Sequence, residues 1–281
     1  MRIRVPTNGR EEKILSSDTP ASRGWAERQL ISEAKGILLD WDGCVAVSNR
    51  VIIGANKLIA RNAGRIAIIS NNSSHLPEDF AHILAESGLA IPTPRIFTAG
   101  VETIRTIAAQ GKPRVLMLAA PKMRRFARDL GVTLVRDEPD MVVLMRDARF
   151  TYAKLERAAN AVRDGARLIV ANADRTHPGP ASRLVPETGA LLAALLACVG
   201  EQAQVEILGK PGPLLFERAC QSLGIEPKQA VMIGDNPETD GEGARRLGMR
   251  SIIVGGASAL SMDDLAEPAT VPAPGALLRT A

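Results

Sequence analysis

The chain has 281 residues, a length at which the usual size of domains predicts either one large domain or two smaller ones. Hydrophobic residues make up 46% and charged residues 23%, which excludes a wholly disordered chain, and the aromatic share of 3% argues against a base-stacking platform for single-stranded nucleic acid. The net charge of +4, from 35 Lys and Arg against 31 Asp and Glu, is not gathered in a basic tail, so it suits a phosphorylated small substrate without requiring nucleic acid.

The first twenty residues are predicted to form a loose leader, because they are charged, broken by Pro6 and Gly9, and lack the apolar stretch of a signal peptide. After them, short apolar runs alternate with segments of helical period, which predicts an α/β protein with parallel strands. The predicted strands are residues 36–39, 65–69, 114–118, 141–145, 167–170, 205–208, 230–233 and 251–254. The predicted helices are residues 77–87, 101–110, 121–130, 152–164, 188–199, 213–223 and 240–247, several opened by Pro or Thr and closed by Gly. The tail after Glu267 is expected to be irregular.

Two polar breaks divide this series. Gly111-Lys112-Pro113 interrupts the pattern like a linker, and residues 200–204 form a second polar stretch. We therefore expect an inserted α/β module, residues 111–205, between two halves of one core, residues 1–110 and 206–281. Within the module, the apolar run at 189–200 is too short to cross a bilayer and is expected to be a buried helix, so no membrane segment is expected.

The most informative segment is GILLDWDGCV, in which an apolar strand runs directly into Asp40 and Asp42. Ligands of open α/β sheets bind at the carboxyl ends of the strands, so these two carboxylates stand where chemistry is expected. Residues two apart at a strand end can face one side, and Gly43 allows the backbone to turn sharply behind them. The pattern indicates a site for a cation and a phosphate.

Three further strand ends carry matching groups. AVMIGDNPETD supplies Asp235 and Asp240, and converging carboxylates would repel one another unless a divalent cation, for oxygen ligands most naturally Mg²⁺, neutralised them. RIAIISNNSSH supplies Ser70 and Asn71, and EILGKPG supplies Lys210, a charge suited to phosphate. Each group alone has a simpler explanation in turn chemistry, but their joint occurrence after apolar strands favours a phosphate site.

With these motifs the chain resembles the haloacid dehalogenase (HAD) superfamily, subfamily IIA, the branch of NagD-like and pyridoxal phosphatase-like hydrolases with a C2-type cap. Residues 40–43, 70–72, 210–211 and 234–240 resemble its four motifs, and VVLMRDARFTYAKL, VANADRTHP and PETG resemble its cap. The resemblance runs from about Lys35 onward. It implies a Rossmann-like core with a parallel sheet and an inserted smaller α/β cap domain.

The resemblance also implies roles for the core residues. Asp40 would attack phosphorus and form an aspartyl-phosphate, while Asp42 would protonate the leaving oxygen and then activate water. Mg²⁺ would be held by the Asp40 side chain, the Asp42 backbone carbonyl and Asp235, with Asp240 orienting the waters on the metal.

The phosphate would be bound by the remaining motifs. Ser70 and the Asn71 amide would bind the phosphoryl oxygens, and Lys210 would offset charge between Asp40 and the phosphate. Because phosphatases, unlike dehalogenases, carry an acid two residues after the nucleophile, the implied reaction is hydrolysis of a small-molecule phosphate monoester. A phosphotransferase or mutase uses the same covalent step and stays open, although large inserted caps go mostly with phosphatases.

The cap would close over the mouth of the core and read the leaving group. In pyridoxal phosphatases of this branch, the loop that matches Asp174 to Pro178 contacts the pyridine ring through a His-Pro, here His177-Pro178. Pyridoxal or pyridoxine phosphate therefore ranks first as substrate, followed by small phosphorylated acids, sugars or glycerol phosphate. The alternative is a loop histidine with no ligand role. Arg146 departs from the branch and either binds a second anionic group of the substrate or pairs with Asp147 or another acid.

Two other classes of function compete with this interpretation. A non-catalytic binding protein could keep the same fold, but the intact acids oppose it, and a Rossmann dehydrogenase lacks its GxGxxG here. The three cysteines are far apart without CxxC spacing, which indicates neither a disulfide framework nor a zinc site and favours a reducing cytoplasm. Related caps often mediate dimers, so besides the phosphate ester a second copy is the one partner expected; nucleic acid and membrane are not.

Overall fold

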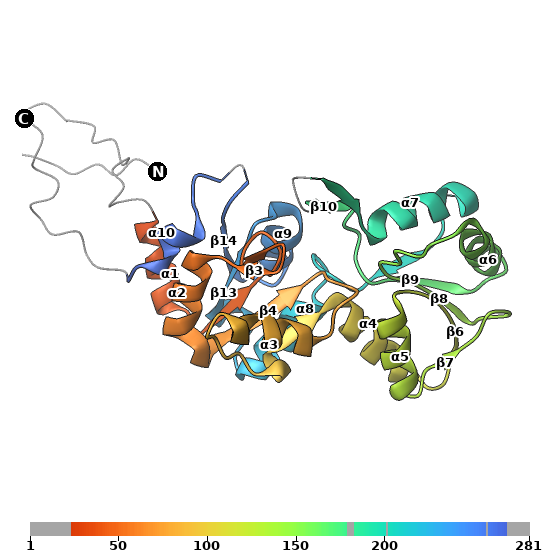
Figure 1. The fold of residues 1–281 in the computed structure, drawn as a ribbon, viewed down its shortest axis with the longest axis horizontal. Helices are drawn as coiled ribbons and strands as arrows, with labels where there is room; N and C mark the ends of the chain where they lie inside the picture. The colour runs from red at the N-terminus through yellow and green to blue at the C-terminus, as the bar shows by residue number, and fades with distance from the viewer. Residues whose placement is uncertain (1–23, 179–182, 201, 257, 269–281) are drawn as a thin grey trace, which may run out of the picture.

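The computed structural model describes residues 24–178, 183–200, 202–256 and 258–268. Within these ranges the chain forms two five-stranded sheets, which lie side by side, each with helices around it (Figure 1). The predicted leader lies outside the described residues, as does the tail after residue 268.

The first sheet is fully parallel and has the order β14-β13-β1-β4-β5. Its strands are β1 (Gly36–Leu39), β4 (Ile66–Ser70), β5 (Ile96–Thr98), β13 (Ala230–Gly234) and β14 (Arg250–Ile253). The central strands β1, β4 and β13 are buried along their whole length, as expected of continuous apolar runs covered by helices on both faces. The helices of this part are α1 (Trp25–Glu33), α2 (Ile53–Asn62), α3 (Pro77–Glu86), α4 (Ala99–Ala108), α8 (Leu214–Leu223), α9 (Glu242–Arg246) and α10 (Met262–Ala266).

One apolar cluster of the first sheet surrounds Trp41, the residue directly after the end of β1 and Asp40. The Trp41 ring is 1% exposed and meets the Phe80 ring of α3 edge to face, with 4.4 Å between the ring centroids. Edge-to-face aromatic pairs add to the stabilisation that burial alone provides. The hairpin of β2 (Ala46–Val47) and β3 (Arg50–Val51) follows, with Ser48 and Asn49 at positive φ.

The second sheet is also parallel and has the order β12-β9-β8-β6-β7. Its strands are β6 (Arg114–Leu118), β7 (Thr133–Leu134), β8 (Met141–Leu144), β9 (Arg167–Val170) and β12 (Val205–Ile207). Helices α6 (Tyr152–Arg163) and α7 (Thr188–Val199) pack against one face, and α5 (Pro121–Asp129) lies on the other (Figure 1). A short antiparallel hairpin joins β10 (Thr176–Pro178) to β11 (Leu184–Pro186).

A single apolar cluster runs from the first sheet into the second. It includes Leu38 and Ile69 of the first sheet, Ile104 of α4, and Met117 and Val143 of the second sheet. Since these side chains exclude water together, the two sheets are packed against one another through α4 and α5 and not merely tethered by linkers.

Every predicted strand and helix appears, with ends shifted by up to two residues, but several other elements were missed. The prediction for 240–247 was incomplete, since residues Pro237–Gly241 form a π-helical turn before α9. The missed elements are α1, α2, α10, β5, β7 and the two hairpins. The predicted division at residues 205 and 206 falls inside β12, which pairs with β9 of the second sheet. The division into 1–110, 111–205 and 206–281 stays a prediction.

Helix α7 is less buried than its composition predicts. Thr188, Gly189, Leu192 and Leu195 are buried, whereas Ala193, Ala197 and Cys198 are exposed. Although α7 contains no charged residue, it packs on the sheet with one side and exposes residues on the other. None of the helices in the described ranges has the length and apolarity needed to cross a membrane.

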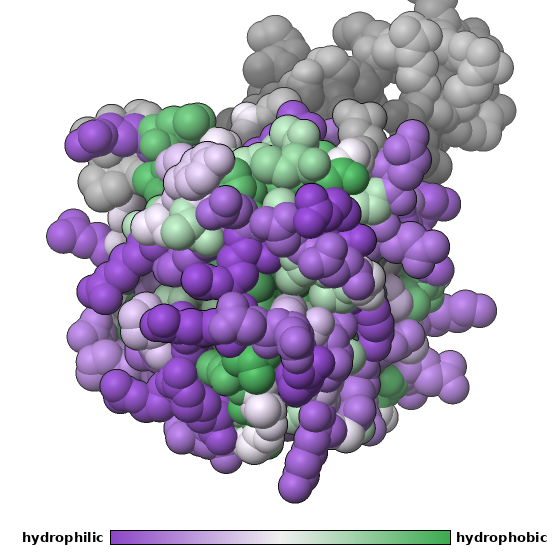
Figure 2. All heavy atoms as spheres, turned by 90° about the vertical axis from the view of Figure 1, so that its right-hand side faces the viewer, coloured by the Kyte–Doolittle hydropathy of each residue, from purple (hydrophilic) through white to green (hydrophobic). Residues whose placement is uncertain are grey.

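The surface at the end formed by the second sheet is mixed in character. Figure 2 shows it as mostly hydrophilic, with smaller apolar patches between charged and polar side chains. Such a surface does not by itself identify a partner, because scattered apolar residues are normal on protein surfaces. The expected homodimer stays a prediction.

Candidate functional site

The candidate site lies at the carboxyl ends of β1, β4 and β13. These strands are neighbours in register, with Leu39 of β1 opposite Ile233 of β13 and Ile68 of β4. The Asp40 N–H donates to the Ile233 carbonyl at 2.9 Å, so the ladder holds Asp40 directly at the sheet edge. The carboxyl ends of the three strands therefore lie side by side at one edge of the sheet.

The turn after Asp40 depends on glycine. Gly43 has φ +79°, which favours glycine, and a Cβ atom there would lie 2.2 Å from Asp235 Oδ2. Any side chain at this position would displace Asp235. Glycine thus brings the first and fourth motifs into contact.

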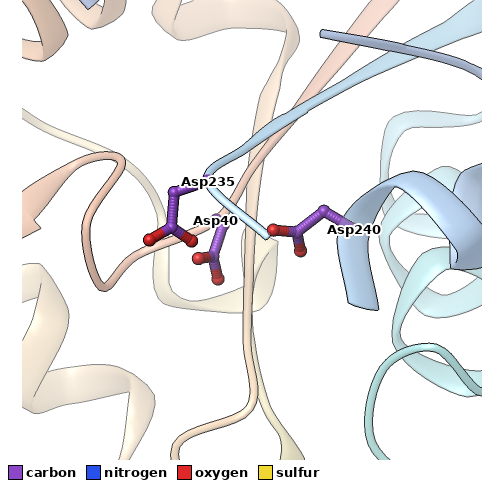
Figure 3. Close-up of side chains that lie close together, drawn as sticks. All are labelled: Asp40, Asp235 and Asp240. Atoms are coloured by element: carbon purple, nitrogen blue, oxygen red, sulfur yellow. The ribbon is translucent and has the colours of Figure 1, made fainter. Parts of the chain in front are cut away.

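Three carboxylates gather at this edge. Oxygens of Asp40, Asp235 and Asp240 lie within 4.8 Å of one another, and Figure 3 shows Asp40 and Asp235 side by side at the strand ends with Asp240 reaching toward them. Asp40 and Asp240 are buried, whereas Asp235 is half-buried. Such an arrangement is costly without cations.

Lys210 supplies one of those cations. Its buried Nζ lies 2.5 Å from Asp40 Oδ1 and 2.6 Å from Asp240 Oδ1. Burial alone would lower the pKa of Lys210, but the carboxylates of Asp240 and Asp40 outweigh it and raise the pKa above its ordinary value. The lysine is therefore held as an ammonium ion.

The acids carry more negative charge than Lys210 offsets. Burial, reinforced by the negative charge of Asp240, raises the pKa of Asp40 well above its usual range despite Lys210. Burial, followed by repulsion from Asp240, raises the pKa of Asp235 to about 6. Both shifts therefore arise first from burial and then from repulsion between neighbouring carboxylates.

The donor set fits a hard divalent cation. All candidate ligands are carboxylate oxygens, which suit Mg²⁺, and a cation would offset the remaining negative charge. Asp240 is already engaged through both oxygens, Oδ1 with Lys210 Nζ and Oδ2 with the Asn236 N–H at 3.2 Å. Asp40 and Asp235 are therefore better placed than Asp240 to contact an ion directly.

The second motif adjoins these acids. Ser70 closes β4, is 2% exposed, and accepts a hydrogen bond through its Oγ from the Asn72 N–H at 3.1 Å. The Asn71 side chain binds the backbone of Lys210, with Oδ1 accepting from the Lys210 N–H at 2.7 Å. The second and third motifs are thus in direct contact.

Asp42 lies at the mouth of the site. Its side chain is open to solvent, and its main chain bridges to Ala46 of β2. Partial desolvation raises the pKa of the Asp42 carboxyl, opposed most strongly by His177 and then by Lys210, with His75 and Arg146 contributing less. Asp42 therefore lies close enough to His177, Lys210 and Arg146 for their charges to act on its carboxyl group.

Arg146 and His177 are joined by Glu187, a residue that the sequence analysis missed. Arg146 Nε lies 3.2 Å and His177 Nδ1 2.7 Å from the same oxygen, Oε1 of Glu187. Arg146 thus pairs with another acid, one of the two expected alternatives, and not with Asp147, whose Oδ2 instead accepts from Lys154 at 2.6 Å. The missed signal was the acid of the PETG segment, which directly precedes α7.

Arg146 and the residue next to Glu187 are tied to the loop after β4. The buried Ser73 Oγ accepts from the Arg146 N–H at 3.0 Å and lies 3.2 Å from Thr188 Oγ1, the residue next to Glu187. Asp174, a predicted cap residue, accepts from Asn71 Nδ2 at 3.3 Å. Burial raises the pKa of Asp174, and the Asn71 hydrogen bond opposes this shift.

The acid cluster, and not a groove elsewhere on the chain, marks the candidate site. A groove of about 580 Å³ lies between α6, the start of β6 and the segment that precedes β8, lined by residues that include Arg114, Arg136, Glu156 and Arg157. None of the predicted site residues lines it. The grouping of acids around Lys210 is the better indicator, because a catalytic site is defined by converging titratable groups.

Two family models match the chain. The family model of haloacid dehalogenase-like hydrolases matches residues 37–133, and the HAD-hydrolase-like model matches residues 207–274. These two stretches contain Asp40, Ser70, Lys210 and Asp235.

Similar proteins cover most of the chain. Chronophin from Rattus norvegicus is 31% identical over 247 residues, which cover 82% of this chain and 79% of that protein. Dihydroxyacetone phosphatase from Corynebacterium glutamicum is 29% identical over 221 residues, covering 77% and 79%. The structure of p-nitrophenyl phosphatase from Archaeoglobus fulgidus superposes with a TM-score of 0.73 at 25% identity, covering 79% of this chain and 86% of that one.

Proposed function

This chain belongs to the haloacid dehalogenase-like hydrolases, in the NagD-like branch, and is a phosphatase that acts on small phosphate esters; we propose that it does so through an aspartyl-phosphate on Asp40. The observation that carries this proposal is the placement of Lys210 Nζ 2.5 Å from Asp40 Oδ1 inside the acid cluster. A buried carboxylate beside an ammonium group and at a strand tip is positioned to act as a nucleophile.

The proposed reaction has two steps. An Asp40 carboxylate oxygen bonds to phosphorus while the bond from phosphorus to the leaving oxygen breaks, and Asp42 gives that oxygen its proton. In the second step water attacks the aspartyl-phosphate, Asp42 accepts the proton of the water, and phosphate leaves as the Asp40 carboxylate is restored. The raised pKa of Asp42 supports the first role, because a carboxyl group must hold its proton in order to donate it.

We further propose Mg²⁺ as the cofactor. The Asp40 and Asp235 side chains and the Asp42 backbone carbonyl would hold it, while Asp240, engaged by Lys210 and Asn236, would orient its waters. The ion would supply charge stabilisation for the phosphoryl oxygens. Support for this assignment comes from the oxygen-only donor set and from its excess negative charge.

Ser70, the main-chain N–H of Asn71 and Lys210 are proposed to bind the transferring phosphoryl group. Ser70 is buried at the end of β4, and Lys210 Nζ lies beside the nucleophile. Donors fixed in place before the reaction stabilise developing charge without reorganisation. Residues 111–205 are proposed to form the cap over this site.

For the substrate, we propose pyridoxal or pyridoxine phosphate. His177 supports this choice. Its Nδ1 contacts a carboxylate oxygen of Glu187, which can only accept a hydrogen bond, so Nδ1 is the donor in that contact. The other ring nitrogen, Nε2, is left for a ligand. A small phosphorylated sugar, acid or glycerol phosphate is the second candidate, favoured by the similarity to dihydroxyacetone phosphatase. Arg146 retains guanidinium nitrogens beyond its Glu187 contact that could bind an anionic group of such a substrate.

A panel of phosphate esters distinguishes these substrates. We expect kcat/KM for pyridoxal phosphate to exceed that for glycerol phosphate and for dihydroxyacetone phosphate, measured as released phosphate with Mg²⁺ present. A higher value for either three-carbon ester would reverse the order. Equal values across the panel would remove the claim of selectivity while leaving the hydrolysis itself in place.

Replacing Glu187 by Gln is expected to raise KM for the preferred ester about 5- to 50-fold while changing kcat less than about threefold, since the loss of one charge-assisted hydrogen bond costs about 1–2 kcal/mol. The amide would no longer hold the His177 imidazole and the Arg146 guanidinium through a charged oxygen. Steady-state kinetics measure the split. Glu206→Gln, which breaks the exposed pair with Arg167 on the second sheet, is the matched control and should leave both constants unchanged. An unchanged KM in the Glu187 variant would contradict a substrate role for this cluster.

A further inference from the structure

The main chain of Lys210 is held by one side chain from another motif. Asn71 Oδ1 accepts from the Lys210 N–H at 2.7 Å, and Asn71 Nδ2 donates to the Lys210 carbonyl at 3.2 Å. A peptide N–H can only donate and a carbonyl can only accept, so chemistry fixes which end of the Asn71 amide faces each group. The amide thus pairs with Lys210 as a neighbouring strand would.

This pairing occurs where the sheet no longer supports the chain. Strand β12 ends at Ile207, and the last sheet-like bond is from the Leu208 N–H to the Val170 carbonyl at 3.1 Å. At Gly209 a Cβ atom would lie 2.6 Å from Asn71 Oδ1, so the absence of a side chain makes room for the amide. The Asn71 side chain therefore makes the hydrogen bonds that a neighbouring strand would otherwise make to Lys210, the residue whose side chain enters the site.

The paired Asn71 side chain and Lys210 main chain, called the clamp below, are also connected to the loop after β9 of the second sheet. Asn71 Nδ2 donates to Asp174 Oδ1 at 3.3 Å as well, and Asn172 Nδ2 donates to the Asn71 carbonyl at 2.8 Å. Both partners belong to the loop that follows β9. The side chain and the main chain of Asn71 are thus each contacted from the proposed cap.

From these contacts we infer that the Asn71 side chain is a positioning residue for Lys210, and that Asp174 completes the clamp when the cap loop is docked on the core. Asn71 holds the Lys210 peptide, and Lys210 Nζ in turn holds Asp40 and Asp240. Withdrawal of the cap loop would leave the amide with two of its three partners. The inference rests on the proposed function only in that Lys210 is taken to act on Asp40 and the phosphoryl group.

A double-mutant cycle with p-nitrophenyl phosphate tests the clamp. Asn71→Ala is expected to lower kcat about 10- to 100-fold in the wild-type background but less than about threefold in a Lys210→Ala background, because a residue that acts through Lys210 has nothing to position once Lys210 is gone. Losses that multiply in the double variant would overturn the inference, since they would mean that the Asn71 side chain acts independently of Lys210. Asp174→Ala should show the same dependence on Lys210 with a smaller loss.

A matched pair of variants separates the effect of added negative charge in this loop from the loss of the clamp. Asn71→Asp puts an acceptor oxygen against the Lys210 carbonyl and the Asp174 carboxylate, so two of the three hydrogen bonds are lost. Asn72→Asp adds the same charge one residue later but keeps its acceptor for the N–H groups of Ser74 and His75. We expect the kcat loss of Asn71→Asp to exceed that of Asn72→Asp by at least about tenfold; equal losses would overturn the inference.

A structural readout separates this inference from the proposed function. The variant used, Asn71→Asp or Asn71→Ala, is one that unfolds thermally in one transition as the wild type does. In its crystal structure, Lys210 Nζ is expected to leave hydrogen-bond distance of Asp40 or Asp240. A lysine that keeps both contacts overturns the clamp whatever the activity. A wild-type protein that hydrolyses no phosphate ester would refute the proposed function, and the position of Lys210 would still decide on the clamp.

Discussion

Asp40→Asn is expected to abolish hydrolysis of p-nitrophenyl phosphate, lowering kcat by at least about a thousandfold, because a neutral amide cannot replace the carboxylate as nucleophile. The substitution keeps the shape of the side chain and an oxygen that can accept from Lys210. The loss should therefore appear in kcat and not as a failure to fold. Released p-nitrophenol, followed with Mg²⁺ in excess, measures it.

The same variant carries a second, independent expectation for stability. Besides burial, repulsion from Asp240 and Asp235 raises the pKa of Asp40; removing the Asp40 charge relieves this repulsion, so the unfolding temperature in a chelating buffer should not fall. Asp137→Asn, at an exposed position outside the site, is the control and should retain full activity. Activity of Asp40→Asn within tenfold of the wild type would eliminate the aspartyl-phosphate mechanism.

Removal of divalent metal is expected to produce the other large effect. Dialysis against a chelator should lower kcat by at least about a hundredfold, and added Mg²⁺ should restore it, because several kcal/mol of charge stabilisation depend on such an ion. Asp235→Asn should respond far less to Mg²⁺, since it removes a proposed ligand from the cluster. Full activity in the chelating buffer would refute the metal assignment while leaving the Asp40 test unaffected.

Metal binding should also stabilise the fold in a pH-dependent manner. In the folded chain the pKa of Asp235 is about 6, above the value of about 3.9 expected in the unfolded chain. The stability contributed by this raised pKa is fully present below about pH 4 and is lost as pH rises through about 6. Mg²⁺ competes with that proton, so the rise in unfolding temperature on adding Mg²⁺ should be larger at pH 7.5 than at pH 5. An equal rise at both pH values, retained in Asp235→Asn, would place the ion elsewhere.

The strands that carry the site could be predicted because their physical signal is local. Strand β1 coincides with the predicted residues 36–39, β4 lies one residue from the predicted 65–69, and β13 extends the predicted 230–233 by one residue. Each is an apolar run that ends at or just before a polar or small residue. In a parallel sheet such runs are buried on both faces, so hydrophobicity alone reveals them. Asp40, Ser70, Lys210 and Asp235 follow from the same rule, since ligands bind at the carboxyl ends.

The missed elements are short or have a mixed pattern. Strand β5 has three residues, and β2, β3 and β7 have two each, too few for a periodic signal. Helix α10 did carry a signal, because Ser261 and Asp264 form a capping box at its start, but its five residues lie near the predicted irregular tail.

Long-range partners were beyond the reach of a single sequence. Asn71 meets Lys210 across 139 positions, and no spacing along the chain indicates which backbone group its amide will bind. Glu187 illustrates the same limit, because an acid before a helix is ordinarily a helix-end residue, and only the fold brings Arg146 and His177 to it. Contacts of this kind are set by tertiary packing and not by local propensity.

The aromatic pair beside Asp40 provides an intrinsic tryptophan fluorescence probe of the site. The chain has two tryptophans, and Trp41 is bonded directly to Asp40 while Trp25 lies at the start of α1. In a Trp25→Phe background the emission would come from the indole against Phe80 alone. Titrating that variant with Mg²⁺ or with inorganic phosphate would follow occupancy by fluorescence, without turnover and without a coloured substrate.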